Sequence, residues 1–151
     1  MKRDTSDRLS RSPIHLLHRA GQCAGDIFHA EMKVGGLTPR QLAVLVTVAQ
    51  NEGLSQTGLV DRTGIDRSTL ADIVRRMQRK GLLQRRRTKE DARAYAVKLT
   101  DEGKRVLRTA EPLAKKVDDR VLEGLPAKQR DQFIDDLLSI VDTLQKMSPQ
   151  S

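Results

Sequence analysis

The stretch that decides the fold is QTGLVDRTGIDRSTLADIVRRM, residues 56–77, together with the two short basic segments that follow it at 82–87 and 94–99. Ser55 and Asp66 precede two short helical segments in the position of N-caps, and Gly64 lies in the turn between them. The second helix runs to about Lys80 and has one apolar face and one face rich in arginine. Two short helices joined by a glycine-containing turn predict a helix-turn-helix unit.

The residues after Gly81 change from a helical to a strand pattern. Segments 82–87 and 94–99 predict two strands of a hairpin, joined by a strongly polar loop at 88–93. A helix-turn-helix unit followed directly by a basic hairpin is the order of a winged helix. An α-helix fits the major groove of DNA, where base edges display distinct patterns, and a wing loop reaches the neighbouring minor groove.

Positive charge is concentrated in the same region. The chain has a formal net charge of +8, and residues 62–108 contain fifteen Lys and Arg against six acidic residues. The rest of the chain is therefore almost neutral. A concentration of positive charge of this kind attracts a polyanion, and a phosphate backbone is the commonest one. The DNA-contacting residues that we predict are Arg67, Ser68, Thr69, Asp72, Arg75 and Arg76 on the helix and Arg86, Arg87, Asp91 and Arg93 in the hairpin.

Two roles are open for Asp91, near the tip of the predicted loop. Phosphate would repel this carboxylate, so we expect it to hold Arg93 or another wing arginine in place. The alternative is that Asp91 is simply a turn-forming residue. Arg93 suits the negative potential of a narrow minor groove.

Helices are predicted on both sides of this unit. Ser12-Pro13 and Thr38-Pro39 each combine an N-cap with proline at the first helical position, and we expect Gly35-Gly36 to end the first of these helices. Thr100 begins a helix to about Leu122, with Pro112 as a kink, and a last helix follows Pro126. The predicted fold is mainly α (α+β), a winged helix-turn-helix with N- and C-terminal dimerisation helices. We expect one domain over 1–151, with a DNA-binding lobe at 37–100 and a helical dimerisation lobe at 12–34 and 101–147.

Composition excludes several classes of protein. Phe28, Tyr95 and Phe133 are the whole aromatic set, too few to stack single-stranded bases in a row. The single cysteine, Cys23, excludes an intramolecular disulfide. The charged N-terminus does not resemble a signal peptide, and the longest apolar stretch, Leu42–Val46, is too short to span a bilayer. No catalytic constellation stands out, so we expect a cytoplasmic protein with no enzymatic activity, no cofactor and no membrane partner.

The sequence resembles the multiple-antibiotic-resistance regulator (MarR) family of transcription factors over roughly residues 14–145. The segments that carry the resemblance are LTPRQ at 37–41, IDRSTL at 65–70, KGLL at 80–83, EDARA at 90–94 and KLTDEG at 98–103. The resemblance implies a homodimer on a pseudo-palindromic DNA site, in which Asp91 and Arg93 form the wing pair. It also implies a pocket between the dimer helices and the winged-helix lobe that accepts aromatic carboxylates or related compounds such as their thioesters.

The terminal helices agree with the implied dimer. Their apolar stripes are wider than the core of a small winged helix needs, so we predict that they form the dimer interface; the alternative is that they cover the core of their own chain. The predicted interface residues are Ile14, Leu17, Phe133, Leu137, Val141 and Leu144. The polar residues that we predict in the ligand pocket are His18, Gln22, Asp26, His29, Arg40 and Arg108.

These features favour a ligand-responsive repressor, and two alternatives remain. One is a thiol-based sensor that acts through Cys23, although this chain lacks tyrosines near that residue and we expect Cys23 to be buried. The other is an architectural protein that binds DNA with little sequence preference. His15 and His18 could share a metal with His29 or Asp26, but nothing else supplies ligands, and we expect no metal.

Overall fold

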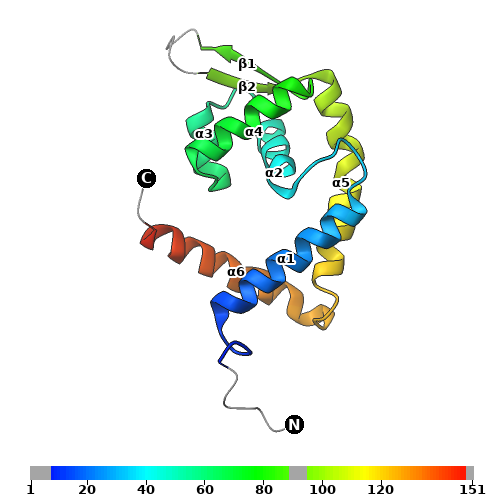
Figure 1. Cartoon of the computed structure of the whole chain (residues 1–151), viewed down its shortest axis with the longest axis vertical. Coiled ribbons are helices and arrows are strands. Elements are labelled where there is room, and N and C mark those ends of the chain that lie inside the picture. The colour runs from blue at the N-terminus through cyan, green and yellow to red at the C-terminus, as the bar shows by residue number, and fades with distance from the viewer. Residues whose placement is uncertain (1–7, 89–94, 149–151) are drawn as a thin grey trace.

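The computed structural model describes residues 8–88 and 95–148 of the chain. It contains six helices and one two-stranded sheet within these ranges (Figure 1). The elements are α1 (Pro13–Glu31), α2 (Pro39–Gln50), α3 (Gln56–Thr63), α4 (Arg67–Arg79), β1 (Leu83–Arg87), β2 (Tyr95–Leu99), α5 (Asp101–Val121) and α6 (Ala127–Met147). The predicted mainly α fold with one short hairpin is confirmed.

The helices begin where the sequence predicts, because each predicted N-cap side chain makes its hydrogen bond. The Ser12 hydroxyl accepts from the His15 N–H at 3.4 Å, and the Ser55 hydroxyl accepts from the Gly58 N–H at 3.0 Å. Thr38 forms a full capping box with Gln41: the hydroxyl accepts from the Gln41 N–H, and the Gln41 side chain accepts from the Thr38 N–H.

The first helix ends three residues earlier than predicted. α1 stops at Glu31, and Gly35 and Gly36 form a separate turn with φ angles of +66° and +57°. This turn brings the chain back so that both Met32 and Leu37 are buried in the core. Lys80 at the end of α4 fixes the turn from outside, since its ammonium donates to the Gly35 carbonyl at 3.3 Å.

The hairpin is antiparallel and is tied to both neighbouring helices. Its register pairs Leu83 with Leu99 and Arg87 with Tyr95. The Val97 N–H donates to the Leu54 carbonyl at 3.0 Å, which joins β2 to the residues just before α3. At its base the Thr100 hydroxyl donates to the Gly81 carbonyl at 2.6 Å, which joins the start of α5 to the end of α4.

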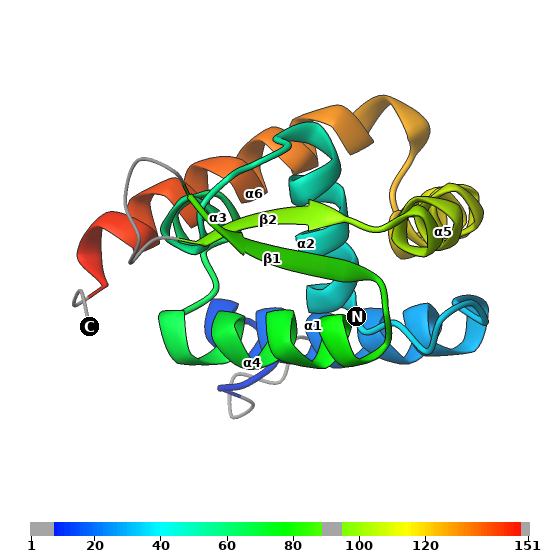
Figure 2. The ribbon, with the colours of Figure 1, turned by 90° about the horizontal axis from the view of Figure 1, so that it is seen from above.

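The core lies between α2, α3, α4 and the hairpin. Leu45, Leu59, Leu70 and Val97 from these four elements are completely buried. Removing side chains of this size from water is the main force that holds the unit together, at about 1.5–3 kcal/mol each. Seen from above, the hairpin lies over α2, with α4 along one side and α5 at one end (Figure 2).

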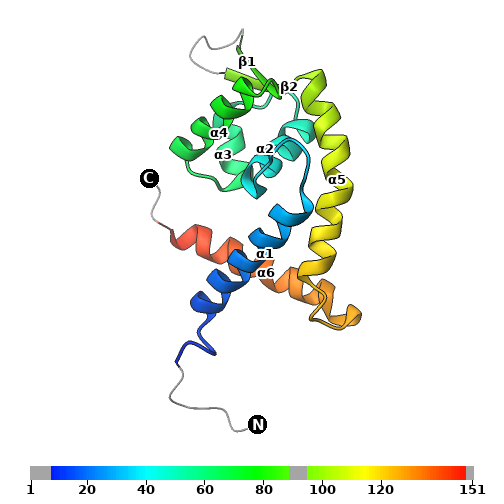
Figure 3. The ribbon, with the colours of Figure 1, turned by 45° about the vertical axis from the view of Figure 1, so that its right-hand side comes forward.

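Helix α5 connects the core to the other end of the molecule. It is helical on both sides of Pro112 and runs from the hairpin to the region of α1 and α6 (Figures 1 and 3). α1 packs along α5, and Glu31 pairs with Lys116 at 3.2 Å and Arg120 at 2.7 Å. In the described part of the chain, no helix is long and apolar enough to cross a membrane.

Candidate nucleic-acid interface

The helix-turn-helix unit forms as the sequence predicts. Gly64 ends α3 with a φ of +70°, a left-handed conformation that glycine adopts without steric cost. Ile65 then enters the core, and Asp66 caps α4. The Asp66 carboxylate accepts from the Thr69 N–H at 3.1 Å and from the Ser68 hydroxyl at 2.9 Å. Hydrogen bonds from Thr69 and Ser68 lower the pKa of Asp66 to about 2.

The outer face of α4 carries most of the predicted DNA contacts. Its inner face, which includes Leu70 and Met77, is buried, so the helix presents the opposite side to solvent. Asp72 pairs with Arg76 at 3.0 Å and lies 3.9 Å from Arg75, which holds both guanidinium groups over one turn of the helix. The predicted residues that are exposed on α4 are Arg67, Ser68, Arg75 and Arg76, whereas Thr69 and Asp72 are half-buried. Arg79 is also exposed and was not in the predicted set.

The hairpin divides its arginines between its two faces. Residues opposite each other in an antiparallel pair point to the same side of the sheet. Arg86 is opposite Ala96 on one side, where it is exposed, whereas Arg85 and Arg87 are on the other side with Tyr95. The predicted contacts Asp91 and Arg93 lie outside the described residues, and their roles remain predictions.

Tyr95 lies against both arginines on its side of the hairpin. The Arg85 guanidinium is 4.4 Å from the centre of the Tyr95 ring, and that of Arg87 is 5.9 Å away. Arg85 also donates to the Gln56 side-chain oxygen at 3.0 Å. A hydrogen bond with Arg87, together with the positive charges of Arg87 and Arg85, lowers the pKa of the Tyr95 phenol. Arg85 is not among the predicted DNA contacts, and its partner Gln56 is 29 residues away in the chain.

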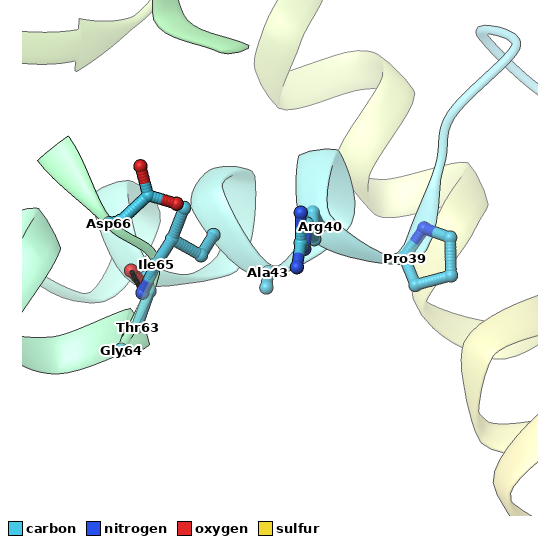
Figure 4. Close-up of a pocket in the computed structure, with 7 residues that line it drawn as sticks. All are labelled: Pro39, Arg40, Ala43, Thr63, Gly64, Ile65 and Asp66. Atoms are coloured by element: carbon cyan, nitrogen blue, oxygen red, sulfur yellow. Dashed lines mark hydrogen bonds between the residues drawn. The ribbon is translucent and has the colours of Figure 1, made fainter. Parts of the chain in front are cut away.

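A shallow hollow lies beside the turn that leads into α4. It has a volume of about 430 Å³ and is lined by the start of α2 and by the turn between α3 and α4 (Figure 4). Arg40, one of the six predicted ligand residues, lines this hollow. The residues drawn in Figure 4 are Pro39, Arg40, Ala43, Thr63, Gly64, Ile65 and Asp66.

A second, more apolar hollow of about 520 Å³ lies between α1, α2, α3 and α5. Phe28, Leu42, Val46 and Val117 form much of its wall, and Arg62 and Asp118 are its charged residues. Burial and the nearby charge of Asp119 raise the pKa of Asp118. Residues of α1 and α5, from the predicted dimerisation lobe, and of α2 and α3, from the predicted DNA-binding lobe, thus line one hollow. The predicted residues His18, Gln22, Asp26, His29 and Arg108 are exposed and line neither hollow.

The residues predicted for a dimer interface lie at the end of the molecule away from the hairpin. Within the described chain, none of the 21 residues of α6 is buried. Leu144 is 53% exposed, Val141 48% and, on α1, Ile14 69%. Leu17 and Phe133 are also exposed, and Leu137 is half-buried. These side chains do not cover the core of their own chain.

The expectation that Cys23 is buried is wrong. Cys23 is an exposed free thiol on α1. The side of α1 that packs inward follows Ala24, Phe28 and Glu31, spaced by four and three residues, and Cys23 falls beside this stripe. Among residues 8–88 and 95–148, no three His, Cys, Asp or Glu side chains gather closely enough to hold a metal ion.

Comparisons with known proteins agree with this arrangement. The model of the MarR family matches residues 35–94. The transcriptional regulator HosA of Escherichia coli O157:H7 is 32% identical over 107 residues, which cover 71% of this chain and 79% of HosA.

Solved structures extend the match over most of the chain. The PcaV transcriptional regulator from Streptomyces coelicolor in complex with its natural ligand is 33% identical, with a TM-score of 0.84 over 89% of this chain and 94% of PcaV. The repressor CouR bound to a 23-mer DNA duplex is 29% identical, with a TM-score of 0.80 over 93% of this chain and 99% of CouR. CouR from Rhodococcus jostii RHA1 bound to p-coumaroyl-CoA is 28% identical, with a TM-score of 0.76 over 89% of this chain and 94% of CouR.

The fold, the exposed arginines of α4 and the basic hairpin define a winged-helix DNA-binding protein of the class that regulates transcription. More narrowly, the chain belongs to the MarR family of transcriptional regulators.

Proposed function

We propose that this protein is a cytoplasmic, ligand-responsive repressor that binds a pseudo-palindromic operator as a homodimer and is released by a small aromatic acid or its thioester. The observation that carries the proposal is the shared position of two cationic surfaces. α4 packs against β1, so the outer face of α4 and the hairpin lie at the same end of the molecule (Figure 3). Residues 37–100 then form the DNA-binding lobe, and 12–34 with 101–147 form the dimerisation lobe.

In this proposal α4 enters the major groove and the hairpin lies along the adjacent backbone. Arg75 and Arg76 are long enough to reach base edges, and their contact with Asp72 keeps them on one side of the helix. Arg86 and Arg87 contact phosphate groups, and Arg93 enters the minor groove. A structure of CouR, which has the same fold, bound to a 23-mer DNA duplex supports duplex DNA as the partner.

The second copy of the chain covers α1 and α6. In the described part of the chain, none of the 21 residues of α6 is buried. Contacts within one protomer therefore do not hold this helix in place. The exposed Val141, Leu144 and Ile14 supply the apolar surface that such a contact needs. A two-fold dimer places its two recognition helices about one helical turn of DNA apart, which matches a pseudo-palindromic site.

The apolar hollow between α1, α2, α3 and α5 is the effector site in this proposal. Its wall of Phe28, Leu42 and Val117 suits an aromatic ring, and Arg62 is a cation at its edge that suits a carboxylate. Among relatives with this fold, PcaV has been solved in complex with its natural ligand, and CouR has been solved bound to p-coumaroyl-CoA, an aromatic thioester. Arg40, next to Pro39 and Ala43 that line both hollows, would approach the effector from the start of α2.

The position of Arg62 explains how the effector would act on DNA binding. Arg62 is in the last turn of α3, two residues before the turn that positions α4. A ligand held between Arg62 and α5 favours one orientation of the helix-turn-helix unit and therefore one spacing of the two recognition helices. A coupling free energy of about 3 kcal/mol would change DNA affinity roughly a hundredfold.

The DNA-binding part is tested with a duplex selected by the wild-type protein from a random-sequence library. Arg75→Ala should weaken binding to this duplex by about tenfold or more, because it removes a contact to a base edge. Lys128→Ala is the matched control, since Lys128 is an exposed cation on α6. Fluorescence anisotropy gives both affinities. Equal binding by the wild type to the selected and to a scrambled duplex would favour the architectural alternative.

The effector is tested separately and without DNA. A thermal-shift screen of aromatic acids and their thioesters identifies a ligand, and calorimetry then measures its affinity. Arg62→Met should weaken binding of a carboxylate ligand by about tenfold, because it removes a charge-assisted hydrogen bond. Lys115→Met serves as the control, because Lys115 is exposed on α5 and does not line the hollow. A Cys23→Ser variant that still responds to this effector, together with a wild type whose DNA binding is indifferent to peroxide, would exclude the thiol-sensor alternative.

A further inference from the structure

The unusual feature of the hairpin is the way in which its only aromatic residue engages two arginines. Tyr95 is the first residue of β2, directly opposite Arg87 at the last residue of β1. Its ring is half-buried but does not belong to the hydrophobic core. Core packing therefore does not explain why an aromatic residue occupies this position.

The ring of Tyr95 instead forms a platform for Arg85. The Arg85 guanidinium lies 4.4 Å from the ring centre, within the range of a cation–π interaction. The same guanidinium donates to Gln56 at 3.0 Å, and Gln56 is the first residue of α3. Arg85 is half-buried, so these two contacts fix a side chain that would otherwise have many rotamers. They also connect the hairpin to the first helix of the helix-turn-helix unit.

The phenol oxygen of Tyr95 engages the second arginine. The Arg87 guanidinium is 5.9 Å from the ring centre, and its interaction with the phenol oxygen lowers the pKa of Tyr95. Arg87 is exposed, unlike Arg85, and it ends the strand that leads toward the wing loop. The ring and the hydroxyl of one residue thus hold two arginines with different exposure.

We propose that Tyr95 is a positioning residue for DNA binding: its ring fixes Arg85 against Gln56, and its hydroxyl orders Arg87 toward a DNA phosphate. The inference rests on the proposed DNA-binding function and gives the hairpin arginines two different roles. Arg85 links the hairpin to α3 through its hydrogen bond with Gln56. Arg87 contacts the DNA, and Tyr95 reduces the entropy that this side chain loses when it binds.

The test is a double-mutant cycle of Tyr95→Phe and Arg87→Met, measured on the duplex selected from the random-sequence library. Tyr95→Phe keeps the ring under Arg85 and removes only the oxygen that holds Arg87. It should weaken binding by about threefold to tenfold, the cost of ordering one long side chain. In the Arg87→Met background the same substitution should have no further effect, because the side chain that it orders is gone.

Salt dependence separates positioning from contact. Arg87→Met should reduce the slope of log affinity against log salt concentration by about one, since one phosphate contact is lost. Tyr95→Phe should leave the slope unchanged, because the number of phosphate contacts is the same. A purely structural role of the hydroxyl would lower the melting temperature and weaken DNA binding equally in both backgrounds, and this result would overturn the inference.

A second cycle tests the ring. Tyr95→Leu should weaken binding more than Tyr95→Phe does, and the excess loss should disappear in the Arg85→Met background. Equal affinities of the Leu and Phe variants would show that Arg85 needs no platform and would overturn this part of the inference. If the wild type selects no duplex at all, the proposed DNA-binding function fails; if it selects one and both cycles are additive, only the inference fails.

Discussion

At the scale of one residue, Asp66 both caps a helix and orients a residue of the recognition surface. As the N-cap of α4 it satisfies the Thr69 N–H, and it also fixes the Ser68 hydroxyl. Ser68 lies in the first turn of α4, the part of a recognition helix that approaches base edges. The same carboxylate that begins the helix therefore orients one of its predicted DNA contacts, and these hydrogen bonds favour its ionised form.

The lowered pKa of Asp66 predicts how stability depends on pH. Hydrogen bonds hold the pKa of this carboxyl at about 2 in the folded protein, below its ordinary value of 3.8. The folded state thus gains stability from Asp66 at pH values above about 4 and loses it as the pH falls toward about 2. We expect Asp66→Asn, which still caps the helix, to flatten this part of the pH profile of unfolding free energy.

Denaturant unfolding of the two proteins between pH 2 and pH 6 measures the difference. Asp66→Ala is the comparison that loses the cap itself, and it should lower the melting temperature by several degrees even at pH 7. Parallel pH profiles for the wild type and Asp66→Asn would contradict the prediction.

At the scale of the elements, the base of the hairpin and α5 meet in a close backbone contact. Gly103, in the first turn of α5, is buried, and a Cβ atom placed on it would lie 2.1 Å from the Leu82 carbonyl oxygen. The Thr100 N–H also donates to that carbonyl at 3.1 Å. The strand, the hairpin base and the long helix therefore meet through backbone atoms, and a side chain would push the elements apart.

The glycine at this contact should not tolerate even one extra methyl group. Gly103→Ala should lower the free energy of unfolding by about 1–3 kcal/mol, because the obstructing atom belongs to the backbone and cannot rotate away. Gly124→Ala is the matched control, since nothing lies within 4 Å of its Cβ position. Its effect should stay within about 0.5 kcal/mol. Urea denaturation compares the two variants, and an equal effect would show that α5 shifts without cost.

At the scale of the whole molecule, the two ends differ in how well one protomer buries their apolar side chains. The end with α4 and the hairpin has a closed core and a cationic surface. The end with α1 and α6 exposes apolar side chains, among them Ile14, Val141 and Leu144. One protomer therefore buries the apolar side chains at the first end. At the second end it leaves α6 without the burial that normally holds a long helix in place.

A charge placed on the apolar side of α6 should separate the proposed dimer. Val141→Asp should give monomers at micromolar concentration, because the carboxylate would have to be buried without a partner. Ser139→Asp adds the same charge on the opposite side of α6, where it should leave the assembly unchanged. Sedimentation velocity reads out both variants. A wild type that sediments as a monomer would contradict the proposed interface.

The local sequence determined the elements, because the signals that begin and end them span only a few residues. Ser12, Thr38, Ser55 and Asp66 each accept the hydrogen bond that an N-cap requires, and the glycine at 64 makes the predicted turn. The winged-helix order and the cationic surface of α4 follow from these elements and from helical periodicity.

Only the tertiary structure decided which side chains meet. Gln56 and Arg85 are 29 residues apart, and the hollow that joins Phe28, Arg62 and Val117 draws on four separate helices. The exposure of Cys23 and the contact of Gly103 with Leu82 likewise depend on how the helices pack. Caps and periodicity act between near neighbours in the chain, whereas convergence of distant side chains depends on the packing of whole elements, which no single stretch of sequence encodes.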